Sequence, residues 1–315
     1  MEIIDAQIHI WEGTPGGVGT PTRPWDTGYD FPFDMENPYT LSAARSAMDA
    51  VGIDAAVIAL PPNYRVMTEA GFHRYDSSYG QQAALSHPGR FAYVAHYDHR
   101  DPEIETLVAG TRTHPGGLGT RVVIRSTAEW HAFERGDCRP LFAAAEKHQV
   151  PLMLFVSGRV SEAGAVARAH PGLQLIVDHL GLKQPPRMTP DPEPFQHLPE
   201  LLALARCPNV AVKITGAPAL SRERYPFADL WPHLLRILDA FGPERVLWGS
   251  DITRVSSLYN YAESLGYLLY ADELSETDKA LILGGTLRRL LRWPAQRAAS
   301  LHVNIPRPGG TPLAG

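Results

Sequence analysis

Two polar side chains near the start of the chain are spaced like groups that act together. Gln7 and His9 lie in the stretch IIDAQIHIW, where polar and apolar residues alternate. Residues two apart in a strand point to the same face, so both would share one face at the strand's carboxyl end. A parallel barrel carries its active site at that end of its strands. Taken alone, such a pair is as often a hydrogen-bonded part of a core, so the rest of the chain must decide.

Further ionisable residues close the later apolar runs in the same way. They stand at the carboxyl ends of the expected strands: His9, His96, Asp98, Arg121, His179, Lys213 and Asp251. Imidazole, carboxylate and cationic groups at one rim can supply a general base, a polariser of a carbonyl and an anion clamp. We therefore expect an active site at this rim. Asp98 is the exception, because the HRDP that follows it is more typical of a helix entry.

Apolar runs of strand length alternate with amphipathic segments along the whole chain. Strands are expected over residues 3–11, 54–60, 91–98, 119–124, 150–156, 173–179, 210–215 and 245–251. Helices are expected over residues 41–52, 79–87, 102–109, 140–148, 162–170, 195–207, 227–241, 258–269 and 276–293. Eight such units predict an α/β fold, the parallel eight-stranded (β/α)8 TIM barrel. A doubly wound open sheet is the alternative, but the first strand is not followed by a glycine-rich phosphate turn.

Composition limits the class of protein. The chain has 315 residues, 44% hydrophobic and 20% charged, with a formal net charge of -5. Such values are ordinary for a soluble enzyme, and without a basic run no nucleic-acid partner is expected. The two cysteines, Cys138 and Cys207, are too few for a disulfide framework or a cysteine zinc site. With no long apolar stretch and no leader pattern, we expect a cytoplasmic protein without a membrane partner, and a homo-oligomer stays open.

Residues 1–293 are expected to form a single domain, with an insertion over residues 12–40 and a Pro/Gly-rich tail over residues 294–315. The insertion is rich in glycine, proline, aspartate and aromatic residues. Loops of this length are usually functional or disordered, and the aromatic residues argue against disorder. We interpret it as a lid over the barrel mouth, with Arg23, Tyr29 and Asp30 as candidate substrate contacts. The alternative is a surface excursion that packs its own aromatic residues.

Three strand-end residues stand in recognisable motifs: His9 in DAQIHIW, His179 in IVDHLG and Asp251 in LWGSD. The segments FAYVAHYDHRDP, VKITG and ILGGTLRRLL accompany them in this order, over about residues 3–292. With this set the chain resembles the amidohydrolase superfamily, specifically the amidohydrolase-2 group with its 2-pyrone-4,6-dicarboxylate lactonase-like and sugar lactonase-like hydrolases. The resemblance implies a (β/α)8 hydrolase whose strand-1 His-x-His pair, strand-6 His and strand-8 Asp surround the scissile carbonyl.

The chain departs from the family pattern at the expected metal ligands. The first histidine of the family's pair is Gln7, the fifth strand ends without histidine, and the fourth offers neither Lys nor Glu as a bridging ligand. A binuclear site is therefore not expected. His9, His179 and Asp251 remain as candidate ligands of one metal, since three ligands and a water can hold a catalytic zinc. We expect either no cofactor or one weakly bound divalent metal, with zinc as the metal if one is present.

The residue types suggest how the work is divided. Asp251 would take a proton from water, while His9 and His179, with Gln7 as a hydrogen-bond donor, would polarise the carbonyl and stabilise the oxyanion. Candidates for binding the substrate, especially an anionic group, are Arg121, Lys213, His96, His73 and Tyr29. Two alternatives stay open: Lys213 as a buried partner of Asp251 or Asp178, and Arg121 as a structural ion pair.

Three functions compete at this stage. The leading hypothesis is a hydrolase that opens the lactone of a small carboxylated molecule. A metal-dependent decarboxylase of an aromatic acid is the second, although the missing ligand at Gln7 counts against it. The third is a non-catalytic homologue that binds a ligand in an inherited pocket, and the presence of Asp251 counts against that.

Overall fold

The computed structural model describes residues 1–12, 38–59, 65–184 and 192–294. Most of the expected lid, including Arg23, Tyr29 and Asp30, lies outside the described residues, and so does the tail from residue 295 onward. The roles assigned to these segments therefore remain predictions. In the described part of the chain, no helix is both long and apolar enough to cross a membrane.

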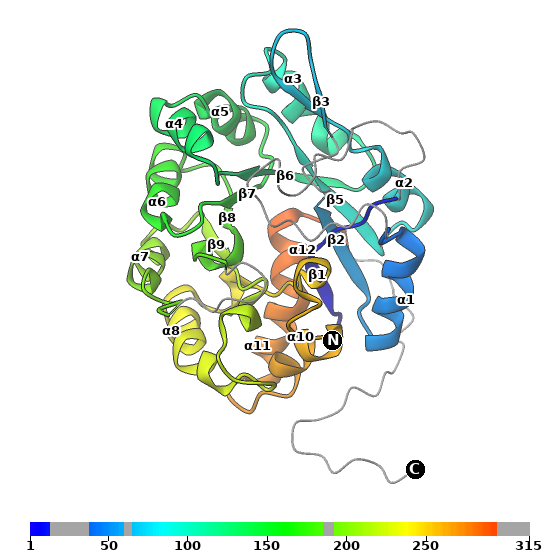
Figure 1. Cartoon of the computed structure of the whole chain (residues 1–315), viewed down its shortest axis with the longest axis vertical. Helices are drawn as coiled ribbons and strands as arrows, with labels where there is room; N and C mark the ends of the chain where they lie inside the picture. Colours follow the sequence, from blue (N-terminus) through cyan, green and yellow to red (C-terminus); the bar gives the residue numbers. More distant parts are fainter. Residues whose placement is uncertain (13–37, 60–64, 185–191, 295–315) are drawn as a thin grey trace.

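Eight parallel strands form the centre of the molecule, surrounded by helices (Figure 1). In sheet order they are β1 (Ile4–Ile8), β2 (Ala55–Ala59), β5 (Phe91–His96), β6 (Gly117–Val123), β7 (Leu152–Phe155), β8 (Leu175–Val177), β9 (Val210–Lys213) and β10 (Val246–Leu247). Each corresponds to one of the eight expected strands. The sheet order follows the chain order, as the right-handed strand-helix-strand repeat of a barrel requires. The (β/α)8 prediction is confirmed.

The sheet closes where the first and last strands meet. The Ala6 amide donates to the Trp248 carbonyl at 3.2 Å, and the Asp251 amide donates to the Gln7 carbonyl at 3.1 Å. The Asp5 carboxylate reinforces this seam, since it accepts from the Gln7 and Ser250 amides at 2.9 Å each. The segments that carry Gln7 and Asp251, although 244 positions apart, are therefore fixed against each other by backbone contacts.

Strand β1 is irregular at the point where it delivers its polar residues. Its register against β2 shifts between Asp5 and Ile8, so one extra residue stands on the β1 side. Bulges of this kind turn side chains toward a new direction and occur next to active sites. Gln7 within the shifted stretch and His9 just after it both contact Asp251.

Apolar side chains fill the barrel below the polar mouth. One buried cluster takes alternate residues of the strands, such as Ile4, Val57 and Ile176, together with Leu287 and Leu291 of the last helix. A larger cluster lies between the outer strand faces and the helices. Since both faces of each strand are covered by apolar layers, the strands appear as near-continuous hydrophobic runs in the sequence.

The helices are α1 (Leu41–Val51), α2 (Ser78–Ser86), α3 (Ile104–Gly110), α4 (Thr127–Arg135), α5 (Arg139–Lys147), α6 (Val160–Ala169), α7 (Leu198–Ala203), α8 (Trp231–Phe241), α9 (Ile252–Val255), α10 (Tyr261–Leu269), α11 (Glu276–Ala280) and α12 (Thr286–Leu291). The first matches its prediction closely, with Thr40 as N-cap and Gly52 in the left-handed region at its end. Helices α4 and α9 were not predicted.

Two other segments differ from the expectation. The expected loop after β2 contains a short antiparallel hairpin, β3 (Arg65–Met67) and β4 (His73–Tyr75). The helix expected over residues 276–293 is interrupted by a π-helical turn, Leu281–Gly285. At this turn the Ile282 carbonyl accepts from Trp248, and a Cβ on Gly284 would lie 2.7 Å from the Glu2 carbonyl oxygen. The helix thus deforms where it contacts the barrel seam closely.

Candidate active site

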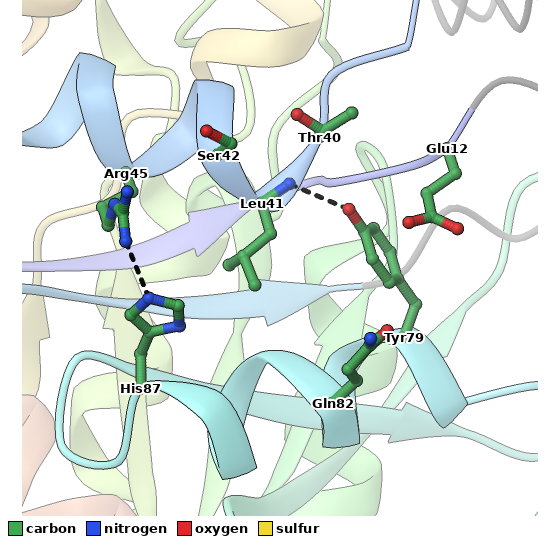
Figure 2. Close-up of a pocket in the computed structure, with 8 residues that line it drawn as sticks. All are labelled: Glu12, Thr40, Leu41, Ser42, Arg45, Tyr79, Gln82 and His87. Atoms are coloured by element: carbon green, nitrogen blue, oxygen red, sulfur yellow. Dashed lines mark hydrogen bonds between the residues drawn. The ribbon is translucent and has the colours of Figure 1, made fainter.

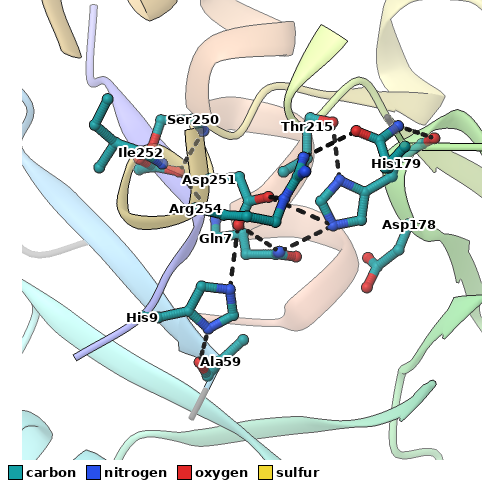
Figure 3. Close-up of polar contacts among 12 residues, drawn as sticks. Gln7, His9, Ala59, Asp178, His179, Thr215, Ser250, Asp251, Ile252 and Arg254 are labelled. Carbon is teal, nitrogen blue, oxygen red and sulfur yellow. Dashed lines mark hydrogen bonds and ion pairs between the residues drawn. The ribbon is translucent and has the colours of Figure 1, made fainter. Parts of the chain in front are cut away.

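Four of the expected site residues meet at the barrel mouth (Figure 3). Gln7 comes from the end of β1, His9 follows it, His179 stands two residues beyond β8, and Asp251 lies beyond β10. All four are at least 97% buried. Asp251 is the centre of the group, because Gln7 Nε2 lies 3.2 Å and His9 Nε2 lies 3.1 Å from its Oδ1.

His9 is held by one ring nitrogen and faces Asp251 with the other. Its Nδ1 donates to the carbonyl of Ala59 at the end of β2, which fixes the proton on Nδ1. Burial lowers the pKa of His9, and the Asp251 carboxylate opposes this shift only in part. The neutral ring therefore presents an unprotonated Nε2 to a carboxylate oxygen. Two acceptors at 3.1 Å attract each other only when a proton lies between them.

His179 has the same tautomer but a different partner. Its Nδ1 donates to the Thr215 carbonyl at 3.1 Å, and its Nε2 lies 3.1 Å from Gln7 Nε2. Burial is the main cause that lowers the pKa of His179 to about 3, so the ring is neutral and accepts a hydrogen bond from the Gln7 amide. Both His179 (φ 52°) and Asp251 (φ 54°) adopt the left-handed conformation, which is unusual for such residues and recurs at functional sites.

Lys213 sets the orientation of the Gln7 amide. Its Nζ donates to Gln7 Oε1 at 2.7 Å from the last position of β9. Because an ammonium group has only donors, the amide oxygen must face Lys213 and the NH2 group must face the opposite way. The NH2 group therefore donates to His179 Nε2 and Asp251 Oδ1. The donor role expected of Gln7 toward a substrate carbonyl stays a prediction.

Arg254 provides the strongest positive charge next to Asp251. Its Nε donates to Asp251 Oδ2, and its Nη2 donates to Gln184 Oε1 at 2.9 Å. Burial alone would raise the pKa of Asp251, but the neighbouring positive charge of Arg254 outweighs it and holds the pKa well below its ordinary value. Asp251 is consequently ionised at neutral pH.

A second buried carboxylate, Asp178, lies beside this group. Lys213 Nζ lies 2.9 Å from its Oδ1, and Arg121 Nε donates to its Oδ2 at 2.6 Å. Burial raises the pKa of Asp178, yet the charges of Lys213 and Arg121 overcome this and lower it overall. Of the alternatives left open for Lys213, the structure supports a buried partner of Asp178.

Arg121 contacts Asp178 through only one edge of its guanidinium group. Its Nη1 and Nη2 have no hydrogen-bond partner within residues 1–12, 38–59, 65–184 and 192–294, although its side chain is only 3% exposed. His96 pairs with Arg121 across β5 and β6, and its Nε2 is likewise buried without a partner among the described residues. Burial and the nearby Arg121 lower the pKa of His96 to about 3. Both neighbours thus have side-chain nitrogens that the described part of the chain leaves without a hydrogen-bond partner.

Among the remaining candidates, His73 contacts Asp98 and not Asp251. His73 lies on β4, with Nδ1 3.5 Å from the Asp98 carboxylate, and Asp98 also accepts from Arg100. The hairpin that carries His73 places Tyr75 against the His96 ring, with ring centroids 5.6 Å apart. Tyr29 lies outside the described residues. The hairpin therefore borders the mouth through Tyr75 rather than through His73.

A hollow on the outside of the barrel, between α1 and α2, lacks these groups (Figure 2). Two of its polar contacts are between its own lining residues: Arg45 Nη1 lies 2.9 Å from His87 Nε2, and the Leu41 amide donates to the Tyr79 hydroxyl. None of the strand-end residues lines it. We therefore assign the candidate site to the barrel mouth.

The candidate metal ligands do not fit a metal ion in this arrangement. Among the described residues, no group of three or more His, Cys, Asp or Glu side chains is placed to hold one. Hydrogen atoms already occupy the lone pairs that a metal would need: the Gln7 amide faces His179 Nε2 and Asp251 Oδ1, and Arg254 donates to Asp251 Oδ2. The hydrogens of the Gln7 NH2 group thus occupy the space among His9, His179 and Asp251 where a metal ion would bind.

Three groups at the mouth were missed by the sequence analysis. Arg254 follows Asp251 by three residues on the four-residue helix α9, and Arg125 lies just beyond β6 over the Phe155 ring. Asp5, whose pKa burial raises to about 6, fixes the seam through Ser250, Gln7 and Tyr261. Their proximity in sequence to strand ends was the available signal, but helix α9 is too short to be recognised from periodicity.

Comparison with known proteins gives the family. The model of the amidohydrolase family Amidohydro_2 matches residues 4–293. L-fucono-1,5-lactonase of Burkholderia ambifaria is 28% identical over 254 residues, which make up 79% of this chain and 79% of that enzyme. The 4-sulfomuconolactone hydrolase of Hydrogenophaga intermedia is 37% identical over 76 residues, which span 24% of this chain and 23% of the relative.

Solved structures share the fold over nearly the whole chain. An amidohydrolase from Burkholderia multivorans with bound zinc has a TM-score of 0.71 at 22% identity, covering 93% of this chain and 100% of that one. A 5-carboxyvanillate decarboxylase from Sphingomonas paucimobilis has a TM-score of 0.59 at 15% identity, covering 93% and 99%. At these identities the structures support the barrel and not an activity. Through its family match, the chain is a hydrolase that belongs to the amidohydrolase family, in the lactonase-like group that its sequence motifs indicated.

Proposed function

We propose that this protein hydrolyses a lactone of a small anionic molecule by activating water at Asp251. The observation that carries the proposal is the meeting of Gln7, His9 and His179 around this one ionised carboxylate. The similarity to L-fucono-1,5-lactonase over 79% of the chain supports the same reaction class.

His9 and Asp251 accept the proton of the attacking water as a pair. The neutral His9 ring and the carboxylate place two acceptor atoms 3.1 Å apart, and a proton placed between them turns this contact into a hydrogen bond. The pair therefore gains an interaction when it takes a proton, which is what a general base requires. The hydroxide equivalent adds to the lactone carbonyl, and the same proton passes to the ring oxygen when the tetrahedral intermediate opens to the hydroxy acid.

The charge of the mouth favours negative charge on the carbonyl oxygen. Three basic side chains, Arg121, Lys213 and Arg254, surround Asp178 and Asp251. Fixed donors and charges in a buried site stabilise a developing oxyanion without reorganising. His179, neutral and held by Thr215, positions the Gln7 amide rather than donating a proton of its own.

An anionic substrate group is expected at Arg121 and His96. The two Nη groups of Arg121 and the Nε2 of His96 have no partner in the described part of the chain, although both side chains are buried. Such groups are costly to leave unsatisfied, and a planar guanidinium edge binds a carboxylate through two parallel hydrogen bonds. We infer a carboxylated lactone as the substrate class.

No step in this mechanism passes through a metal ion. The Gln7 amide and Arg254 satisfy the lone pairs of His179 and Asp251 on which a metal would depend. We therefore infer that the enzyme works without a tightly bound metal. A metal-dependent decarboxylase would need the ligand that Gln7 replaces, so this alternative is not favoured.

A screen of five- and six-membered lactones, with and without a carboxylate, tests the proposal. Release of acid is followed with a pH indicator, before and after dialysis of the protein against a chelator. Turnover of a carboxylated lactone that survives dialysis supports the proposal, and Asp239→Asn on the exposed face of α8 serves as the control for Asp251→Asn. Turnover that disappears on dialysis and returns with zinc contradicts the metal-free mechanism. Absence of turnover with every lactone contradicts the function.

A further inference from the structure

Arg254 is the basic side chain nearest to the candidate base, and the mechanism above leaves part of it unused. It stands on α9 (Ile252–Val255), the short helix that starts directly after Asp251. Its Nε donates to Asp251 Oδ2, and Figure 3 shows the side chain extending past Asp251 toward Thr215 and His179. The guanidinium group thus lies on the mouth side of the candidate base.

The side chain is held from two further directions. Nη2 donates to Gln184 Oε1 at 2.9 Å, and Gln184 in turn reaches the His179 carbonyl. Gly216 adopts φ 68°, and a Cβ there would lie 3.1 Å from Arg254 Nη2 and 3.6 Å from His179 Nδ1. A side chain at this position would crowd Arg254 Nη2, so the backbone of Gly216 packs closely against the guanidinium group. These contacts hold the guanidinium group of Arg254 in one orientation.

One nitrogen of the held group remains open. Nη1 of Arg254 has no hydrogen-bond partner within the described ranges, and the side chain is 16% exposed. A guanidinium group has five N–H donors, of which Asp251 and Gln184 use one each. The unused donors belong to a partly exposed side chain that directly contacts Asp251.

We propose that Arg254 binds an anionic group of the substrate through its open Nη1 edge and so determines which lactones are accepted. This inference rests on the proposed lactonase function and deepens it. One planar group would then contact both Asp251 and the substrate anion, which places the anion close to the reacting carbonyl. The carboxylate that Arg254 binds is carried on a ring carbon next to the ester group, whereas Arg121 and His96 would bind a second acceptor group of the same substrate.

A structural role for Arg254 gives a different expectation. An arginine that only orients Asp251 affects every lactone equally, because the base is the same for all of them. An arginine that also binds the substrate anion affects carboxylated lactones more than neutral ones. The ratio of kcat/KM for a carboxylated lactone to kcat/KM for its neutral counterpart separates the two roles, because the effect on Asp251 cancels in it.

The experiment compares 5-oxotetrahydrofuran-2-carboxylate with γ-butyrolactone as substrates of the wild type, Arg254→Met and Arg254→Lys. For Arg254→Met we expect the selectivity ratio to fall by about 10- to 100-fold, mainly through KM of the carboxylated lactone, as for the loss of a hydrogen bond to a charged group. Arg254→Lys keeps the positive charge but loses the planar guanidinium group, so its selectivity ratio should lie between those of the wild type and Arg254→Met. The exposed Arg45→Met on α1 is the matched control and should leave the ratio unchanged.

Binding of an unreactive ring keeps the test independent of turnover. Calorimetry measures the preference of each protein for tetrahydrofuran-2-carboxylate over tetrahydrofuran-2-carboxamide. A wild type that prefers the carboxylate and loses this preference in either Arg254 variant supports the inference, even when no lactone is hydrolysed and the proposed function itself fails. If Arg254→Met does not fold, Arg254→Lys decides. A selectivity ratio and a ligand preference that stay at the wild-type values in Arg254→Met, or in Arg254→Lys where Arg254→Met does not fold, overturn the inference.

Discussion

Asp178 and Asp251 are both fully buried carboxylates that follow barrel strands, but they have different partners. Asp178 lies between two basic side chains, Lys213 and Arg121; burial lowers the pKa of Lys213, and the Asp178 charge opposes this shift. Asp251 has one permanent cation, Arg254, and otherwise faces the Gln7 amide and the His9 ring. The first carboxylate therefore lies between two basic side chains, whereas the second also contacts a neutral imidazole that can share a proton with it.

This difference in partners indicates a structural role for Asp178 and a chemical role for Asp251. Asp178 neutralises Lys213 and Arg121, and through Lys213 it fixes the orientation of the Gln7 amide. Asp251 lies at the other end of the same chain of contacts, where the amide, a neutral imidazole and an incoming water meet. We interpret Asp178 as the buried counter-charge that organises the mouth, and Asp251 as the group that takes part in the chemistry.

The strongest test of this division is Asp251→Asn. The amide cannot accept the proton of the attacking water, so we expect kcat to fall by roughly 10²- to 10⁴-fold, the usual contribution of a general base. Substrate affinity should stay within about tenfold, because the base acts on the barrier. Steady-state kinetics with the best lactone of the screen, together with equilibrium binding, measures both. A variant that keeps more than a tenth of the wild-type kcat would remove Asp251 from this role.

Asp178→Asn tests the other carboxylate. Removing it leaves Lys213 and Arg121 buried without their counter-charge, which typically costs about 3–5 kcal/mol of the free energy of unfolding. Urea unfolding measures this loss, and Asp239→Asn on the exposed face of α8 should change the free energy of unfolding by less than about 0.5 kcal/mol.

Because the pKa of Asp178 is lowered in the folded state, its stabilisation is present above the unfolded-state pKa of about 3.9 and is lost as the pH falls further. An Asp178→Asn protein as stable as the wild type contradicts the structural role.

The barrel itself could be predicted because its signals are local. Each strand is an apolar run of the right length, and the first helix has a capping threonine and a terminal glycine, Thr40 and Gly52. The convergence of His9, His179 and Asp251 also followed, since polar residues at strand ends share one rim in a barrel. The three-residue strands of the β3–β4 hairpin are too short to show a period.

The contacts within the site could not be predicted in the same way. The orientation of the Gln7 amide depends on Lys213, 206 positions later, and no local pattern encodes that contact. The orientation of Arg254 depends on Gly216 and Gln184, which other elements bring together. A sequence shows which groups reach the mouth, whereas the pairing between them depends on side-chain packing across several strands.

Gln7→His sharpens the comparison by replacing the uncharged partner of Asp251 with a metal ligand. It removes the amide hydrogens that face His179 and Asp251 and adds an imidazole beside His9. We expect zinc affinity to rise by about tenfold or more, on the scale of changes in the surroundings of a metal site. Metal analysis after dialysis against zinc compares the variant with the wild type. Equal zinc content in both would contradict the idea that the amide hydrogens occupy the space where a metal ion would bind.

The loss of activity at low pH provides the test with the smallest expected effect, and it is specific to the His9–Asp251 pair. Burial lowers the pKa of His9, and the proposed pair is active only with Nε2 unprotonated. Activity should therefore be lost as the pH falls through a value below the ordinary histidine pKa of about 6.5. In His9→Asn the carboxylate acts alone, so the acidic limb of the pH-rate profile should move to lower pH while kcat on the plateau falls. A limb that stays in place in His9→Asn would mean that Asp251 takes the proton without sharing it. In that case Asp251 alone would act as the base. His9 would be a fixed structural contact of Asp251, as Lys213 is of Asp178.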